Sequence, residues 1–374
     1  MRIKALPIAA GLTVALLGGS AINFALAQAA PVAPVAPIGQ ALPSLAPVVG
    51  EVLPSVVSIA VQGEMVKPVS QNGGPQDGQS PFFLQFGDGP QAQQPQKVQG
   101  EGSGVIVDAA KGLIITNNHV VDFADKIAVT LSDGRTLTGK VLGKDPGTDI
   151  ALVQVPADNL TAIKFAAPQD VRVGDYVVAV GNPFGLGETV TSGIVSAVGR
   201  SGLGIEGYEN FIQTDASINP GNSGGALVDL KGDLVGMNTA IVGPGGGSVG
   251  VGFAIPAQMI QQVVAQIEKY GDVQRGQLGI QIQNLSPDII AAMGLPARQD
   301  GALVADVTAN SPAAGAGIKA GDIVTAVNGQ VIASSTDLRN DIGVMRAGDK
   351  VDLKVLRDGK TINASLTLAK AAAA

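Results

Sequence analysis

The sequence of 374 residues contains no cysteine, no tryptophan and a single histidine. The absence of cysteine excludes disulfide bonds and thiolate chemistry. A chain with one histidine also cannot form an H-E-x-x-H motif or most zinc sites, so we expect no metal ion and no cofactor. Any reaction that needs an imidazole as its base must therefore use His119.

Basic residues are also scarce. The chain has 24 Lys and Arg against 31 Asp and Glu, which gives a formal net charge of −7 and a pI near 4.8. The basic residues are spread along the chain, so we expect no nucleic-acid partner. Aromatic residues make up only 3%, whereas 51 glycines and 22 prolines indicate many turns and short strands. The length allows two or three domains, and we expect mostly β structure.

The first 27 residues have the pattern of a secretory signal peptide. Arg2 and Lys4 precede an apolar run over residues 6–17, and Ala25-Leu26-Ala27 supplies a small-x-small cleavage site. We therefore expect an exported protein whose residues 1–27 are removed. The alternative is an uncleaved anchor in the inner membrane, which Pro7 and the glycines of the apolar stretch disfavour.

The next segments alternate between linker composition and strand composition. Residues 28–50 are rich in Pro and Ala and are predicted to be a linker, and Ser55–Val61 is the first predicted strand. Residues 66–99 are rich in Gln, Gly and Pro, and we expect a flexible loop there. Within it, Pro81–Phe86 is either a local hydrophobic anchor or a contact for another subunit.

A serine between glycines is the strongest candidate nucleophile. The segment Thr214–Gly225 reads T-D-A-S-I-N-P-G-N-S-G-G and places Ser223 after a tight turn at Gly221. A serine needs a base within hydrogen-bond reach and donors for the oxyanion that forms, and the N–H groups of Gly221 and Ser223 could be those donors. Without a histidine partner, the motif would be only a glycine-rich turn.

Residue order distinguishes two kinds of serine hydrolase. The pattern G-x-S-x-G also fits the nucleophile elbow of α/β-hydrolases, including esterases, in which the histidine follows the serine. Here His119 precedes Ser223. The order histidine, acid, serine is instead that of the two-barrel serine proteases.

Two aspartates compete for the role of the acid. Asp149 directly precedes the predicted buried strand Ile150–Val155, so its carboxylate would be shielded at the end of an apolar layer. Asp215 is the alternative acid, and its non-catalytic interpretation is a buried hydrogen-bond acceptor near the loop of Ser223. Other aspartates between His119 and Ser223, including Asp122, Asp133, Asp145 and Asp175, lie mostly in turn sequences and are interpreted as loop formers.

The rest of the chain predicts two barrels, a helix and a small domain. Two sets of six strands, before and after about residue 165, fit a double barrel. A helix is predicted over Ala257–Tyr270. The last segment, 275–370, is predicted to be a small α+β domain. Either the edge of its sheet accepts a peptide strand, or the domain is a structural appendix. Its predicted elements are strands at 278–282, 302–307, 323–327, 351–356 and 361–368 and a helix at 336–345.

Several motifs resemble those of the HtrA family of serine endoproteases, of the DegP and DegQ type. They are I-I-T-N-N-H-V-V, T-D-I-A-L-V-Q-V, G-N-P-F-G-L-G-E-T-V-T-S-G-I-V-S-A, I-Q-T-D-A-S-I-N-P-G-N-S-G-G-A-L and G-F-A-I-P, and they cover most of residues 50–256. R-G-Q-L-G-I-Q-I and S-P-A-A-G-A-G-I-K-A-G-D-I-V resemble a PDZ domain. The chain differs from DegP in having one PDZ-like segment and no cysteine pair in the long N-terminal loop.

The resemblance implies a fold and a set of site residues. The implied fold is a chymotrypsin-like double β-barrel over residues 51–256, a connecting helix over 257–274 and a PDZ domain over 275–370. The implied catalytic residues are His119, Asp149 and Ser223. The implied oxyanion and substrate-binding residues are Gly221, Asn222, Ser223, Ile218, Asn238, Thr239, Ala240 and Ile241, and the implied peptide-binding residues of the PDZ domain are Gln277, Leu278, Gly279 and Ile280.

The resemblance also implies a function. We expect an ATP-independent periplasmic endopeptidase for unfolded or misfolded exported proteins, acting in quality control and stress response, with peptide C-termini bound at the PDZ domain. A homotrimer is the family's common assembly. Ser217, which is not acidic, and the apolar Ile218 and Ile241 imply cleavage after small or medium apolar residues. The alternative is a chaperone or peptide-sensing adaptor in which proteolysis is secondary.

Overall fold

The computed structural model describes residues 44–65, 96–182, 189–241 and 248–370. The predicted signal peptide and most of the predicted 66–99 loop therefore lie outside the described residues. No helix within the described ranges is both long and apolar enough to cross a membrane.

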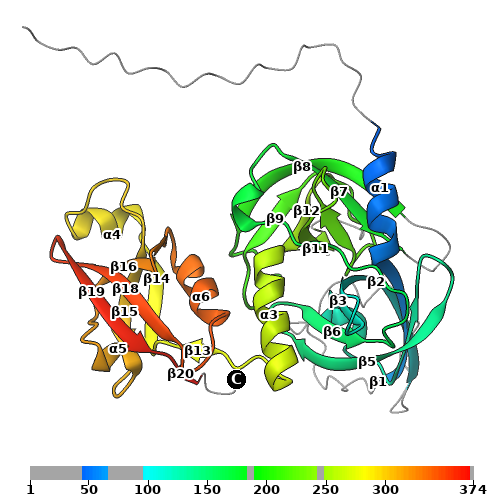
Figure 1. Ribbon diagram of the computed structural model, residues 1–374. Helices are drawn as coiled ribbons and strands as arrows, with labels where there is room; N and C mark the ends of the chain where they lie inside the picture. Colours follow the sequence, from blue (N-terminus) through cyan, green and yellow to red (C-terminus); the bar gives the residue numbers. More distant parts are fainter. Residues whose placement is uncertain (1–43, 66–95, 183–188, 242–247, 371–374) are drawn as a thin grey trace, which may run out of the picture. The chain divides into compact units, whose positions relative to one another are not determined.

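The first half of the predicted double-barrel region is a closed antiparallel barrel with the strand order β1-β2-β3-β6-β5-β4 (Figure 1). Its strands are β1 (Val56–Met65), β2 (Gln96–Asp108), β3 (Leu113–Asn117), β4 (Lys126–Thr130), β5 (Thr136–Asp145) and β6 (Ile150–Gln154). Strand β3 is buried along its whole length, as its apolar sequence requires. Strand β2 is longer than predicted and includes residues 96–99, which the sequence had assigned to the flexible loop.

The second half is another closed barrel, with the order β10-β11-β12-β9-β8-β7. Its strands are β7 (Tyr176–Gly181), β8 (Thr189–Arg200), β9 (Phe211–Thr214), β10 (Ala226–Val228), β11 (Leu234–Ile241) and β12 (Gly252–Pro256). The mostly β fold and the chymotrypsin-like double barrel predicted from the sequence are confirmed.

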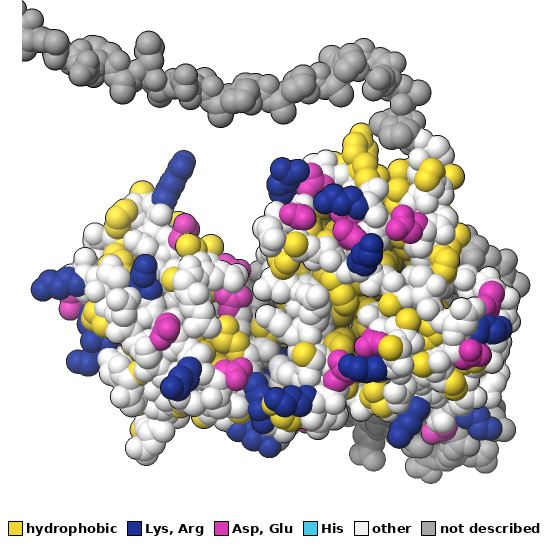
Figure 2. Space-filling model, in the orientation of Figure 1, with side chains coloured by type: hydrophobic (Ala, Val, Ile, Leu, Met, Phe, Trp, Pro, Cys, Tyr) yellow, Lys and Arg dark blue, Asp and Glu magenta, His cyan; other side chains and the backbone are white. Residues whose placement is uncertain are grey.

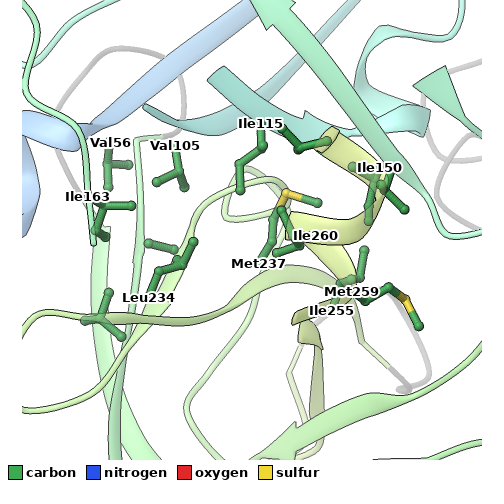
Figure 3. Packing of buried hydrophobic residues seen from close by; sticks show 14 of the residues in the cluster. Val56, Val105, Ile115, Ile150, Ile163, Leu234, Met237, Ile255, Met259 and Ile260 are labelled. Carbon is green, nitrogen blue, oxygen red and sulfur yellow. The ribbon is translucent and has the colours of Figure 1, made fainter. Parts of the chain in front are cut away.

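One hydrophobic cluster joins the two barrels. Figure 3 shows side chains of both barrels and of helix α3 (Ala257–Tyr270) packed together. Ile115 and Ile150 come from the first barrel, and Met237 and Ile255 from the second. All four are at most 1% exposed. Because the two barrels share this core, residues at the end of β3 and at the start of β6 are held against the second barrel.

Helix α3 has the predicted bounds, which follow from its sequence. It begins after Pro256 and ends at Gly271, whose φ of 75° closes the helix with an N–H bond to the Ile267 carbonyl. Its apolar residues recur at helical spacing and are buried in the shared core.

A short helix, α1 (Ala46–Val52), lies within the predicted 28–50 linker and was not expected. Val52 is buried, and Leu45, Val48 and Val49 pack against the shared core. These positions have the i, i+3, i+4, i+7 spacing of an amphipathic helix, which the Pro and Ala composition of the preceding residues concealed. The predicted linker therefore ends before residue 46. The first strand begins after α1 and the 3-10 turn Leu53–Ser55.

The C-terminal region contains a five-strand sheet path, β14-β15-β16-β18-β19, with β17 attached to β16. Its elements are β13 (Gly276–Gln277), β14 (Ile280–Asn284), α4 (Pro287–Ala292), β15 (Ala302–Val307), α5 (Pro312–Gly315), β16 (Ile323–Val327), β17 (Gln330–Val331), α6 (Ser335–Gly343), β18 (Lys350–Arg357), β19 (Lys360–Thr367) and β20 (Ala369–Lys370). The predicted strand 278–282 is shifted: β14 begins only at Ile280, because Gly279 has a φ of 75°, and it continues to Asn284. Helices α4 and α5 were not predicted, although Ser286-Pro287 and Ser311-Pro312 are N-cap sequences.

Charged side chains are mixed on the visible surface. Figure 2 shows Lys and Arg interspersed with Asp and Glu over this face of the molecule. Interspersed charges of both signs are typical of protein surfaces.

Candidate active site

The imidazole of His119 is presented at the end of a buried strand. Strand β3 ends at Asn117, and the chain turns at once into the one-turn helix α2 (Asn118–Val121), which carries His119. The neighbouring residues Val120 and Val121 are buried and hold this turn against the barrel. The His119 side chain is 20% exposed, so it can meet a substrate.

Asp149 faces this helix from the turn before β6. Its carboxylate accepts a bond from the His119 backbone N–H at 2.9 Å and lies 2.8 Å from His119 Nδ1. A carboxylate only accepts hydrogen bonds, so Nδ1 carries a hydrogen, and in the neutral imidazole the proton-accepting lone pair is on Nε2. Asp149 has a φ of 56°, a left-handed conformation that aspartate tolerates better than most residues. The side chain is 4% exposed.

Thr239 on β11 completes the environment of this carboxylate. Its hydroxyl donates to Asp149 Oδ2 at 2.8 Å and lies 3.1 Å from Asn117 Nδ2. All three residues are buried. The second barrel therefore helps to fix the acid carried by the first, and the ionised form of Asp149 is surrounded by donors.

Ser223 follows a turn in which some backbone N–H groups already donate hydrogen bonds within the protein and others do not. The N–H of Asn222 donates to the Asn219 carbonyl at 3.0 Å, and the Gly225 N–H donates to the Asn222 carbonyl at 2.9 Å. Within the described residues, the N–H groups of Gly221 and Ser223 have no acceptor. Gly221 has a φ of 96°, which glycine alone adopts without strain. These two N–H groups are thus available to a ligand oxygen.

The Ser223 hydroxyl donates to the Thr239 carbonyl at 3.3 Å. A hydroxyl has one hydrogen, so in this conformation that hydrogen points towards Thr239. The same residue thus contacts Ser223 through its backbone and Asp149 through its side chain. Thr239 had been predicted as a substrate-binding residue, and its link to Asp149 was not foreseen.

Asn238 and Asp215 have other partners in the structure. The Asn238 N–H donates to the Gly225 carbonyl, and its carbonyl accepts from the Gly224 N–H. Its backbone therefore supports the turn that carries Ser223. Asp215, the alternative acid, is exposed rather than buried and accepts a bond at 2.7 Å from the Ile194 N–H of β8.

The remaining predicted residues are partly described. Ile218 is 1% exposed. Ala240 and Ile241 form the end of β11, paired with Phe253 and Gly252, and their side chains lie outside the described set. In the C-terminal domain, Gln277 pairs with Ala369, and Ile280 begins β14. Leu278 and Gly279 lie between these two strands.

A half-buried carboxyl group lies near the catalytic candidate Asp149. Burial, together with the negative charges of Asp149, Glu209 and Asp145, raises the pKa of Glu206 to about 8. The neighbouring Glu209 is buried and accepts backbone N–H bonds from Leu203 and Ile205, at 2.6 Å each. Near neutral pH, Glu206 is therefore largely protonated, unlike an ordinary glutamate.

No cluster of three or more His, Asp or Glu side chains within the described ranges is arranged to hold a metal ion. The groups that the site brings together are an imidazole, a carboxylate, hydroxyls and backbone N–H groups. These groups suit acyl transfer by a serine nucleophile.

Comparison with known proteins agrees with this geometry. The family model of the trypsin-like peptidase domain matches residues 102–237, and that of the PDZ domain matches residues 276–368. The periplasmic serine endoprotease DegP of Salmonella typhimurium is 52% identical, over 95% of this chain and 78% of its own length. The periplasmic pH-dependent serine endoprotease DegQ of Escherichia coli is 51% identical, over 87% of this chain and 70% of its own length.

Solved structures give the same assignment. The HtrA-type protease AlgW with a decapeptide is 39% identical, with a TM-score of 0.67 over 88% of this chain and 100% of that one. The serine endoprotease from Yersinia pestis is 32% identical, with a TM-score of 0.57 over 89% of this chain and 100% of that one. The chain therefore belongs to the HtrA family of periplasmic serine endoproteases, in which a trypsin-like peptidase domain is followed by a PDZ domain.

Proposed function

We propose that Ser223, His119 and Asp149 are the nucleophile, the base and the orienting acid of this endoprotease. The observation that carries the proposal is the contact between His119 Nδ1 and Asp149 Oδ2, at 2.8 Å, in a chain with one histidine. That contact leaves Nε2 as the proton acceptor, as the mechanism requires.

The proposed reaction begins with rotation of the Ser223 hydroxyl from the Thr239 carbonyl towards the imidazole. Ser223 Oγ then attacks the scissile carbonyl carbon while His119 Nε2 takes its proton, and the imidazolium formed is stabilised by Asp149. The N–H groups of Gly221 and Ser223 hold the oxyanion. His119 gives the proton to the leaving amine as the C–N bond breaks. Water then attacks the acyl-enzyme carbonyl while His119 takes a proton from it, and this proton passes to Ser223 Oγ as the ester C–O bond breaks.

Labelling with a peptidyl phosphonate ester that carries an apolar terminal residue tests this assignment. The reagent phosphonylates an activated serine, and we expect the adduct on the peptide that contains Ser223. His119→Ala should slow labelling by at least about 10³-fold, because the hydroxyl loses its base. An adduct on another serine, or rapid labelling of His119→Ala, would contradict the assignment.

We further propose that the substrates are unfolded exported polypeptides, cut after small or medium apolar residues. The support is the apolar Ile218, buried beside Gly252 of β12, and the absence of an acid at position 217. Peptide libraries scanned at the residue before the cut should give higher kcat/KM for Val or Ala than for Lys. A preference for Lys or Arg would contradict this part of the proposal.

The PDZ domain is proposed to bind peptide C-termini between β14 and α6. β14 is an edge strand in the sheet order of the described residues, and an added strand would pair with its open side. Apolar side chains of β14 and α6 line the groove together with Leu278, which precedes β14: Leu278, Ile280, Ile282, Leu338 and Ile342. Ile280→Arg should weaken binding of a peptide with an apolar C-terminus by at least about tenfold, measured by fluorescence anisotropy.

The assembly and the cellular role are also proposals. The support is the family membership, which makes a homotrimer active in envelope quality control the expected form. Mass measurement of the native exported protein tests the subunit count and also whether residues 1–27 are removed. Suppression of aggregation by Ser223→Ala would add a chaperone activity to the proteolytic one.

A further inference from the structure

The hydroxyl of Ser103 is buried against the nucleophile turn, and the proposed mechanism does not use it. Ser103 lies on β2 of the first barrel and is 0% exposed. Its Oγ donates to the Gly221 carbonyl at 2.6 Å and accepts a bond from the Asn182 N–H at 2.8 Å. Its own N–H donates to the Ser223 carbonyl at 2.8 Å. One residue of the first barrel thus holds two carbonyls of the turn that carries the nucleophile.

The bond to Gly221 fixes a peptide group that the turn needs. The carbonyl of Gly221 and the N–H of Asn222 belong to the same planar peptide. Ser103 holds the carbonyl end, and the Asn219 carbonyl holds the N–H end at 3.0 Å. The Gly221 N–H is joined to this plane through a single Cα, so fixing the plane limits the φ and ψ of Gly221 that set the direction of that N–H. That N–H is one of the two proposed oxyanion donors.

The backbone is packed so closely here that the turn has little room to adjust. A Cβ at Gly224 would lie 2.1 Å from the Ser103 carbonyl oxygen, and one at Gly181 would lie 2.8 Å from Asn222 Cα. The Thr116 hydroxyl donates to that Ser103 carbonyl at 2.7 Å. Thr116 lies on β3, three residues before His119. Ser103 therefore connects the strand of the base to the turn of the nucleophile.

We propose that Ser103 is a positioning residue that orients the Gly221 N–H for the oxyanion through its bond to the Gly221 carbonyl. The inference rests on the proposed roles of Ser223 and Gly221. It predicts that Ser103 affects transition-state stabilisation more than substrate binding, because the oxyanion exists only after attack.

The test compares Ser103→Ala with a matched control, Thr214→Val. Thr214 is also 0% exposed, and its hydroxyl also bridges a carbonyl and an N–H, from Ile194 O at 2.8 Å to Ala216 N at 3.1 Å. Both variants lose one buried bridging hydroxyl, so a purely structural effect should lower Tm in both. We expect kcat to fall by about 10- to 100-fold in Ser103→Ala with KM within about threefold, and by less than about threefold in Thr214→Val.

The affinity for a transition-state analogue measures the stabilisation of the oxyanion directly. A peptide boronic acid forms a tetrahedral adduct with the nucleophile, so its affinity for Ser103→Ala should fall by the same factor as kcat/KM, while the pH profile of kcat/KM keeps its shape. Should Ser103→Ala fold poorly, Ser103→Cys supplies a weaker donor and should give an intermediate kcat.

The outcomes separate this inference from the proposed function. Full activity of Ser223→Ala would overturn the catalytic assignment itself. An inactive Ser223→Ala together with a Ser103→Ala that matches Thr214→Val in kcat, or that keeps full affinity for the boronic acid, would overturn only the role of Ser103.

Discussion

The hydroxyl of Thr239 donates to Asp149 Oδ2 at 2.8 Å, on the same carboxylate oxygen that faces His119 Nδ1. Thr239 belongs to the second barrel and Asp149 to the first. The orientation of the base thus depends on both barrels, and the shared core of Figure 3 is what holds them together.

Removing this hydroxyl should slow catalysis without unfolding the protein. Thr239→Val keeps the shape of the side chain but removes a bond to a charged group, which contributes about 1.5–3 kcal/mol. We expect kcat to fall by about 10- to 100-fold, measured with a fluorogenic peptide. Thr130→Val, which loses an exposed hydroxyl pair with Thr136, is the control and should keep its rate. Equal rates for the two variants would show that Asp149 is held without Thr239.

Because Asp149 has a left-handed backbone conformation, substitutions there can distinguish backbone strain from the loss of the carboxylate. Asn tolerates a φ of 56°, whereas Ala at that angle costs about 1–2 kcal/mol. Asp149→Asn, which keeps this backbone angle without strain, should therefore unfold at a higher urea concentration than Asp149→Ala. Both should lose on the order of 10⁴-fold in kcat, because the imidazole loses its carboxylate partner. A fully active Asp149→Asn would remove the acid from the mechanism.

Two glycines with positive φ should differ sharply in their tolerance of alanine. At Gly224 a Cβ would lie 2.1 Å from the Ser103 carbonyl oxygen and 2.5 Å from Thr116 Oγ1, whereas at Gly202 nothing lies within 4 Å. Gly202→Ala should cost only the backbone strain, about 1–2 kcal/mol. Gly224→Ala should cost about 3 kcal/mol or more and abolish activity, because the nucleophile turn must move. Equal urea midpoints for the two would contradict the close packing.

Stability should depend on pH through Glu206. Burial raises its pKa from 4.5 to about 8 in the folded protein, so between these values the folded chain keeps a proton that the unfolded chain has lost. The free energy of unfolding should therefore decrease as pH rises from about 5 to 8. Glu206→Gln should flatten this decrease, and Glu51→Gln, at an exposed position of α1, should not. Urea unfolding at a series of pH values measures how the free energy of unfolding changes with pH. The same pH dependence in Glu206→Gln and the parent would show that the Glu206 carboxyl is exposed to water.

Local sequence patterns predicted much of the fold. Helix α3 and strands β15 and β16 have the expected bounds, because apolar spacing and flanking Pro or Gly define their ends. The order of His119, Asp149 and Ser223 was enough to favour a double barrel over an α/β-hydrolase. Helix α1 was missed because the Pro and Ala composition before it resembles a linker.

The cross-barrel contacts could not be predicted in this way. Ser103 and Gly221 are 118 positions apart, and a serine that bonds a distant carbonyl has no periodic pattern. The same holds for Thr239 and Asp149, which are 90 positions apart. The raised pKa of Glu206 depends on burial beside acids that the fold brings together. Such features follow from tertiary packing alone.

The most direct test of the account is the turnover of an unfolded protein substrate by Ser223→Ala. The variant should keep the Tm of the parent within a few degrees, since it removes one hydroxyl whose only bond among the described residues is 3.3 Å long. Its kcat should fall by at least about 10⁴-fold, because the remaining groups cannot form an acyl-enzyme. Cleavage at the rate of the parent, by a folded variant free of contaminating protease, would contradict the assignment of Ser223 as the nucleophile.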